Sequence, residues 1–184
     1  MPYKYYGGVH PDYMKAPANK TPVTAIAPPK QVVLPMMQHI GAPNQPLVKV
    51  GDEVKVGQLI GSNPAPVSAP IHATVSGKVI AVEPRRHMLG DMVMSVVIEN
   101  DGLDTPCEDM RPLTPEQLRD PEAILARIRE AGVVGMGGAM FPTAFKIAGG
   151  RGKVDTLIIN GAECEPYLCG DHRTMLENPQ ELLN

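Results

Sequence analysis

The sequence predicts a mixed α and β protein, in which a small all-β barrel or sandwich precedes the first part of an α/β domain. Short apolar runs separated by glycine and proline turns fill residues 31–101, whereas helix-start signals appear only after residue 112. The 20 prolines and 18 glycines among 184 residues favour short elements over a helical bundle. We expect an N-terminal arm at 1–30, a barrel at 31–101 and the α/β part at 102–184.

The N-terminal arm carries no pattern of a regular element. Its proline-rich half, Ala16 to Lys30, cannot sustain a helix or an inner strand. The arm is expected to lie over the body of this chain or over another subunit, and a partly ordered tail is an equal alternative.

The segment 31–101 has apolar residues at strand spacing, each run ended by a turn residue. Most runs fit one alternating phase, but after Gly77 two phases overlap: Val79 and Ala81 alternate, and so do Ile80 and Val82. The runs that predict strands are Val32–Leu34, Leu47–Val50, Val54–Val56, Leu59–Ile60, Ile71–Val75, Val79–Val82 and Met92–Ile98.

Part of this segment resembles the hairpins of the biotinyl and lipoyl barrel-sandwich hybrids. The resemblance lies in Val50–Ile60, followed by Ala69-Pro70 and Ser76–Val79. Those carriers hold a lysine on an exposed hairpin, and the equivalent stretch here, Ser62–Ser68, has none. The barrel is therefore expected to serve as a scaffold or docking surface, and not as a swinging arm.

Helix signals follow the linker at Asp104–Pro112. A cap, a proline and a glutamine occur in Thr114–Gln117, and Asp120-Pro121-Glu122 repeats the start signal. Gly132 is the expected end of that helix, and polar helices are predicted from Asp171 and Pro179.

Between these helices, Val154 and Leu157–Ile159 predict a buried parallel strand that ends at Asn160. One strand with a few helices cannot close an α/β core. The sequence is therefore expected to be the front part of a longer protein.

Two loops carry candidate chemistry. The first is Gly135–Pro142 followed by Lys146, where glycines let backbone N–H groups approach a ligand and the lysine supplies a cation. It matches neither the P-loop nor the dinucleotide fingerprint, because the first needs Gly-Lys-Ser/Thr and the second needs a preceding strand. The second loop, Asn160–Tyr167, leaves the predicted strand with an amide, two carboxylates and an aromatic ring.

Together, Gly-Met-Gly-Gly-Ala-Met-Phe-Pro-Thr-Ala-Phe-Lys and Asn-Gly-Ala-Glu-Cys-Glu-Pro resemble the FMN/NADH site of the flavin subunit of respiratory complex I. The complete order, from Gly7-Gly8-Val9-His10-Pro11 through the barrel and glycine loop to Asp171-His172-Arg173, is closer to the RnfC family of the Rnf electron-transport complexes. Complex I subunits commonly have Asp at Ala162, and Arg and Gly where Met136 and Met140 stand.

The resemblance implies non-covalent FMN, NAD(H) beside it, and 4Fe–4S clusters downstream of residue 184. It implies phosphate and dinucleotide contacts at the first loop, ring stacking at its phenylalanine, and flavin contacts at the second loop. The implied cofactor-binding residues are Gly135, Gly137, Gly138, Ala139, Phe141, Lys146, Asn160, Glu163 and Glu165.

The implied function is that of a subunit of a membrane-bound, NAD-linked, ion-translocating oxidoreductase, with this piece alone inactive. It would be peripheral on the cytoplasmic face of the membrane, with other Rnf subunits as partners and ferredoxin as an indirect one. Alternatives are a related electron-transfer subunit of a soluble cobalamin or proline reductase, and a non-catalytic barrel scaffold. A net charge of −3 argues against a nucleic-acid surface, no apolar run approaches a bilayer span, and three cysteines favour free thiols.

Overall fold

The computed structural model describes residues 11–136, 138–156 and 158–183. The described residues form two compact units. One is the continuous segment 27–155, and the other joins 11–26 to the described part of 156–183. The segment Gly7–His10 and the site residue Gly137 lie outside the described residues.

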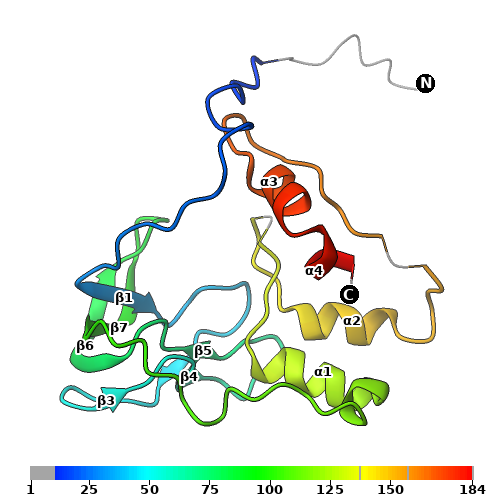
Figure 1. The fold of residues 1–184 in the computed structure, drawn as a ribbon. Helices are drawn as coiled ribbons and strands as arrows, with labels where there is room; N and C mark the ends of the chain where they lie inside the picture. Colours follow the sequence, from blue (N-terminus) through cyan, green and yellow to red (C-terminus); the bar gives the residue numbers. More distant parts are fainter. Residues whose placement is uncertain (1–10, 137, 157, 184) are drawn as a thin grey trace, which may run out of the picture. The chain divides into compact units, whose positions relative to one another are not determined.

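The larger unit contains the barrel-sandwich, which is built from two antiparallel sheets (Figure 1). In the first sheet, the long hairpin of β6 and β7 is central and the two shorter strands flank it in the order β1-β7-β6-β3. Its strands are β1 (Gln31–Pro35), β3 (Glu53–Val54), β6 (Gly77–Arg86) and β7 (Met92–Asn100). The second sheet has the order β2-β4-β5, with β2 (Gln45–Pro46), β4 (Leu59–Ser62) and β5 (Ile71–His72).

Alternate residues of these strands build one apolar core, as the sequence predicts. Burying each such side chain contributes roughly 1.5–3 kcal/mol, so this cluster is the main source of the unit's stability. The buried core residues are Leu34, Met36, Val54, Ile60, Ile71, Ala73, Val75, Val79, Val96 and Ile98.

A β-bulge explains the two overlapping phases after Gly77. Val79 pairs with Ile98 and Ala81 pairs with Val97, so Ile80 is an extra residue on β6. The bulge reverses the phase of the strand. Val79 lies in the core before it, and Val82 packs against the core after it.

One predicted strand is displaced. Leu47 and Val50 are 54% and 60% exposed and do not belong to a strand, whereas the preceding Gln45–Pro46 pairs with β4. The predicted turn follows, with Gly51 at φ +98° and the Asp52 carboxylate accepting the Lys49 N–H at 3.0 Å. The apolar run therefore belongs to the approach to the turn.

A buried polar cluster lies under the hairpin that in biotinyl and lipoyl domains holds the modified lysine. His39 Nε2 accepts the Ala69 N–H at 3.1 Å, and Asn44 Nδ2 donates to the Ala69 carbonyl at 2.8 Å. These bonds fix the hairpin base by neutral groups. The cluster suits a scaffold, as the missing lysine predicts.

The helices begin where the sequence predicts. Thr114 and Gln117 form a reciprocal capping box, although only a short 3₁₀ turn, η1 (Gln117–Arg119), follows it. Asp120 caps the longer α1 (Pro121–Glu130) through the Glu122 N–H at 3.0 Å. The remaining helices are α2 (Thr143–Gly150), α3 (Gly170–Glu177) and α4 (Pro179–Leu183).

The prediction of a buried strand at 154–159 is wrong for its described residues. Val154, Ile158 and Ile159 are 70%, 83% and 62% exposed and belong to no strand, and Leu157 lies outside the described residues. A doubly buried strand needs neighbouring strands to satisfy its backbone groups. Among the described residues, no strand pairs with this segment.

The end of β7 carries an acid-sensitive tie. The Asp101 carboxylate accepts the Leu103 N–H at 2.8 Å and the Ser76 hydroxyl at 2.7 Å, and these bonds lower the pKa of Asp101. A lowered pKa means that the stabilisation is complete above the unfolded value near 3.9 and is lost as pH falls through the folded value.

We therefore expect Asp101→Asn to flatten the acid side of the stability profile. The measurement is the urea midpoint by circular dichroism between pH 6 and 2. Asp104→Asn is the matched control, because the Asp104 side chain has no hydrogen bond to the described residues. An unchanged acid slope in Asp101→Asn would contradict the role of this tie.

Candidate cofactor loops

The glycine loop is held at its start by the end of α1. The Gly132 N–H donates to the Arg129 carbonyl at 3.0 Å and the Val133 N–H to the Ile128 carbonyl at 3.3 Å, which is the Schellman arrangement. Gly132, the predicted end of the helix, has φ +67°. The chain therefore leaves α1 in a fixed direction toward the loop.

Antiparallel bonding closes the loop on itself. Val134 bridges Pro142, the Gly135 N–H donates to the Phe141 carbonyl at 2.9 Å, and the Thr143 N–H donates to the Val133 carbonyl at 2.9 Å. The closed loop leads directly into α2, which packs against α1. Two helices thus anchor the residues between the paired ends.

Inside the loop, the backbone adopts conformations that favour glycine. Gly138 has φ +121°, and a Cβ there would meet nothing within 4 Å, so its backbone conformation and not crowding calls for glycine. Met140 has φ +49°, in the left-handed region, at the position where complex I subunits commonly have glycine. Among the described residues, the N–H groups of Gly138, Ala139 and Met140 have no hydrogen-bond partner.

Lys146 projects back from the first turns of α2 to the start of the loop. A Cβ built on Gly135 would lie only 3.1 Å from Lys146 Nζ, so the ammonium lies directly over this glycine. Lys146 is exposed, and it forms no ion pair with a carboxylate of the described residues. The prediction that groups Gly135 with Lys146 therefore has a geometric basis.

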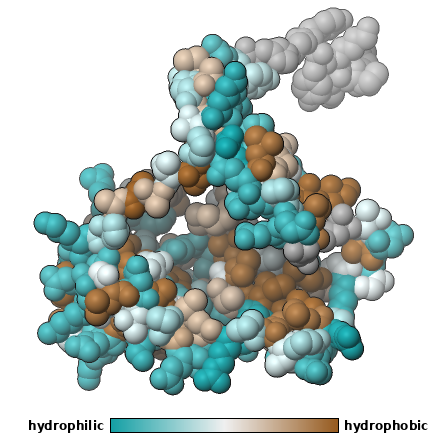
Figure 2. All heavy atoms as spheres, in the orientation of Figure 1, coloured by the Kyte–Doolittle hydropathy of each residue, from teal (hydrophilic) through white to brown (hydrophobic). Residues whose placement is uncertain are grey.

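Phe141 and Phe145 form an edge-to-face pair beside the loop. Their ring centroids are 5.7 Å apart and the ring planes meet at 73°. Figure 2 shows apolar side chains gathered over α1 and α2, and exposed residues of this region include Val133, Phe145 and Ile147. The aromatic pair offers a ring edge and an apolar surface next to the free amides.

The second loop uses its polar side chains on its own backbone. Asn160 Oδ1 accepts the Ala162 N–H at 2.9 Å. The Glu163 carboxylate accepts the N–H groups of Asp171 and His172 at 3.4 and 3.3 Å, so it caps the N-terminus of α3. Glu165 has an exposed side chain, and its carbonyl accepts a hydrogen bond from Lys15.

The two loops belong to different units. Gly135, Gly138, Ala139, Phe141 and Lys146 lie in the unit of residues 27–155. Asn160, Glu163 and Glu165 lie in the other unit. The structure brings residues together within each loop, and a single site made of both remains a prediction.

Two contributions were missed by sequence reasoning. Lys15 contacts the second loop from 150 residues away, and no local pattern announces such a contact. Glu163 acts as a helix cap for α3, and its distance of eight residues from Asp171 hides it from capping rules that look three residues ahead.

The described ranges show neither a metal centre nor a bilayer-spanning helix. Cys107, Cys164 and Cys169 are free thiols, and these ranges contain no group of three metal-binding side chains. None of their helices combines the length and the apolar character needed to cross a bilayer.

Comparison with known families matches both segments. Residues 3–103 match the RnfC barrel sandwich hybrid domain, and residues 128–184 match the Nuo51 FMN-binding domain. The first match alone covers more than half of the chain.

Similar proteins carry related names. The RnfC subunit of the Na⁺-translocating ferredoxin:NAD⁺ oxidoreductase complex of Acetobacterium woodii is 48% identical over 180 residues, covering 97% of this chain and 41% of that protein. Its counterpart in the proton-translocating complex of Clostridium ljungdahlii is 45% identical, covering 97% of this chain and 39% of that protein. The counterpart in the ion-translocating oxidoreductase complex of Klebsiella pneumoniae is 41% identical, covering 99% and 24%.

The chain thus spans less than half the length of these relatives. Its barrel-sandwich fold, its glycine loop between α1 and α2, and the two family matches occur in one order along the sequence. The chain belongs to the RnfC family of Rnf complex subunits.

Proposed function

We propose that this protein binds FMN and NAD(H) and passes electrons between them and 4Fe–4S clusters, as the RnfC subunit of an ion-translocating ferredoxin:NAD oxidoreductase. Family membership supports the subunit role, and the match of residues 128–184 to an FMN-binding domain supports the flavin. Because fold alone does not establish function, the flavin assignment also rests on the loops.

The observation that carries the proposal is the first loop. It combines three unpartnered N–H groups, at Gly138, Ala139 and Met140, with the Lys146 ammonium held over Gly135. Backbone donors and one mobile cation are the groups that bind a phosphate in cofactor loops. The open space beside Gly138 leaves the backbone accessible to such a ligand.

The donor set fits a flavin nucleotide when the two loops are assigned separate tasks. The first loop would hold a phosphate of FMN or of the dinucleotide, and the Phe141 ring would flank the nicotinamide or adenine. Asn160, Glu163 and Glu165 would line the flavin, with the amide NH₂ of Asn160 as a donor. Since Glu163 already caps α3, its part would be to fix the loop and contribute remaining lone pairs.

Bound FMN would supply hydride acceptance from NADH and stepwise release of electrons. This chain's residues would orient the two rings and neutralise the phosphate. A 4Fe–4S cluster needs four thiolates, so the chain's three cysteines cannot complete one. We propose that the clusters are bound outside these 184 residues.

Other subunits of the complex would be the partners, with ferredoxin reached through them. We place the protein peripherally on the cytoplasmic face of the membrane. A non-catalytic barrel scaffold would share the fold but would have no use for the unpartnered amides beside Lys146.

Flavin analysis tests the proposal. Protein purified with its complex should release close to one FMN per RnfC subunit on denaturation, and NADH should bleach the 450 nm band under anaerobic conditions. FMN content must be measured on RnfC separated from the rest, since other subunits can hold flavin. Absence of both FMN and NADH bleaching in the separated RnfC would favour the scaffold.

Gly135→Ala separates ligand binding from folding. The new methyl group would displace the Lys146 ammonium, which is the flexible end of a side chain, so the stability change should stay within about 0.5 kcal/mol. FMN affinity should fall severalfold because the cation is moved. Titration by flavin fluorescence quenching measures this, and Gly149→Ala, with no neighbour within 4 Å, is the control.

A further inference from the structure

We propose that residues 13–23 of the N-terminal arm form a strap that holds the second cofactor loop, with Lys15 as its positioning residue. The inference rests on the proposed function, because it assigns the strap a role in flavin binding. All of its contacts lie inside the unit formed by 11–26 and the described part of 156–183. Figure 1 shows the arm, in blue, beside the loop that precedes α3.

Lys15 makes the central contact. Its ammonium donates to the Leu168 carbonyl at 2.6 Å and to the Glu165 carbonyl at 3.2 Å. One charged group therefore ties together two carbonyls three residues apart and fixes the turn between them. Hydrogen bonds with an ionised donor are roughly twice as strong as neutral ones.

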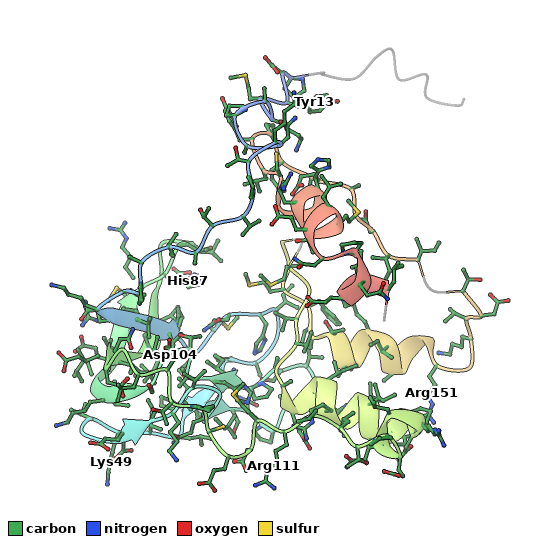
Figure 3. All side chains as sticks on the ribbon, viewed as in Figure 1. Tyr13, Lys49, His87, Asp104, Arg111 and Arg151 are labelled. Carbon is green, nitrogen blue, oxygen red and sulfur yellow. The ribbon has the colours of Figure 1, made fainter. Side chains whose placement is uncertain are left out.

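The backbone on either side of Lys15 adds two contacts. The Tyr167 N–H donates to the Tyr13 carbonyl at 2.9 Å, and Figure 3 shows Tyr13 where the arm meets this loop. The buried Cys169 thiol lies 3.8 Å from the Lys15 carbonyl. Tyr167 has φ +70°, a conformation that favours glycine, so the strap holds the loop in a backbone state that it would not adopt freely.

The other end of the strap is tied to α3. Arg173 Nη1 donates to the Asn19 carbonyl at 3.2 Å, and the Glu177 carboxylate accepts the Val23 N–H at 3.1 Å. Arg173 and Glu177 pair with each other on the same helix. The Arg173 hydrogen bond, followed by the Val23 N–H, lowers the pKa of Glu177, so this end stays tied down to acidic pH.

These contacts surround the residues assigned to the flavin. Glu165 is a candidate site residue, and Lys15 holds its peptide group. Glu163 caps α3, whose Arg173 and Glu177 hold the far end of the strap. The loop is thus fixed from both sides, which is what a cofactor site needs in order to bind without first ordering a flexible loop.

The strap also connects the two family matches. Residues 13–23 fall in the segment matched by the RnfC barrel sandwich hybrid domain, whereas their partners fall in the segment matched by the FMN-binding domain. A domain that bound FMN without the arm would lack Lys15. The arm therefore makes flavin binding depend on the N-terminal segment.

The test compares Lys15→Met, Lys15→Arg and Lys20→Met in the full-length protein. Lys20 is an exposed lysine on the same arm with no hydrogen bond to the described residues, so it controls for charge. The FMN dissociation constant, the visible circular dichroism of bound flavin and hydrogen exchange of residues 160–169 are measured for each. Glu177→Gln loosens the far end without touching Lys15, should Lys15→Met fail to fold.

We expect Lys15→Met to weaken FMN binding by about tenfold and to raise exchange of the loop. Lys15→Arg should restore much of both, and Lys20→Met should match the wild type. Unchanged FMN affinity and flavin dichroism in Lys15→Met would overturn the inference and leave the proposed function intact. A wild-type protein that binds no FMN would overturn the proposed function, and the inference with it.

Discussion

Replacing Gly77 by alanine is expected to remove a large part of the stability of the barrel, about 3 kcal/mol or more. Gly77 begins β6 with φ +143°, and a Cβ there would lie 1.9 Å from the Glu99 carbonyl oxygen. That oxygen belongs to the backbone of β7, so it cannot move without breaking the pairing of the two central strands. Urea unfolding followed by circular dichroism measures the loss.

Gly51→Ala provides the matched control. Gly51 also has a positive φ, +98°, but a Cβ there would meet nothing within 4 Å. This variant should cost only the conformational strain, about 1–2 kcal/mol. Equal losses in the two variants would show that the close approach of Gly77 to β7 does not matter.

Replacing Lys146 by methionine is expected to weaken FMN binding about ten- to a hundredfold. The substitution keeps much of the apolar length of the side chain and removes the ammonium that lies over Gly135. A hydrogen bond to a charged group contributes about 1.5–3 kcal/mol, which gives this range of affinities. Flavin fluorescence quenching measures the dissociation constant, and added salt should weaken the wild type more than the variant.

Lys153→Met controls for the loss of one positive charge. Lys153 is an exposed lysine beyond the end of α2 and lies outside the glycine loop. It should bind FMN like the wild type, and all three proteins should unfold at similar urea concentrations because both lysines are exposed. Equal FMN affinity of Lys146→Met and wild type would remove Lys146 from the site.

Local signals predicted the barrel and the helix boundaries well. Alternating burial identified most strands, and the doubled phase at Val79–Val82 reflected a real bulge. Asp120 and Gly132 act as the start and stop of α1 because capping depends on residues within one turn. Such features are readable from sequence since both partners lie close together along the chain.

Features that depend on distant partners were not predicted. The apolar run at Val154–Ile159 looked like a buried strand, but burial requires neighbouring strands and its described residues are exposed. Lys15 gave no signal, because its acceptors at Glu165 and Leu168 lie more than 100 residues away. The candidate loops themselves were found from residue types, whereas the cap formed by Glu163 required the fold.

Hydrogen exchange measured on the full-length protein with and without FMN addresses the glycine loop itself. The backbone N–H groups of Gly138, Ala139 and Met140 have no partner in the described structure, so bound FMN should slow their exchange strongly. The hairpin tip at His87–Asp91 should not change and serves as an internal reference. FMN binding at full occupancy with no protection of residues 138–140 would contradict the assignment of this loop to the cofactor.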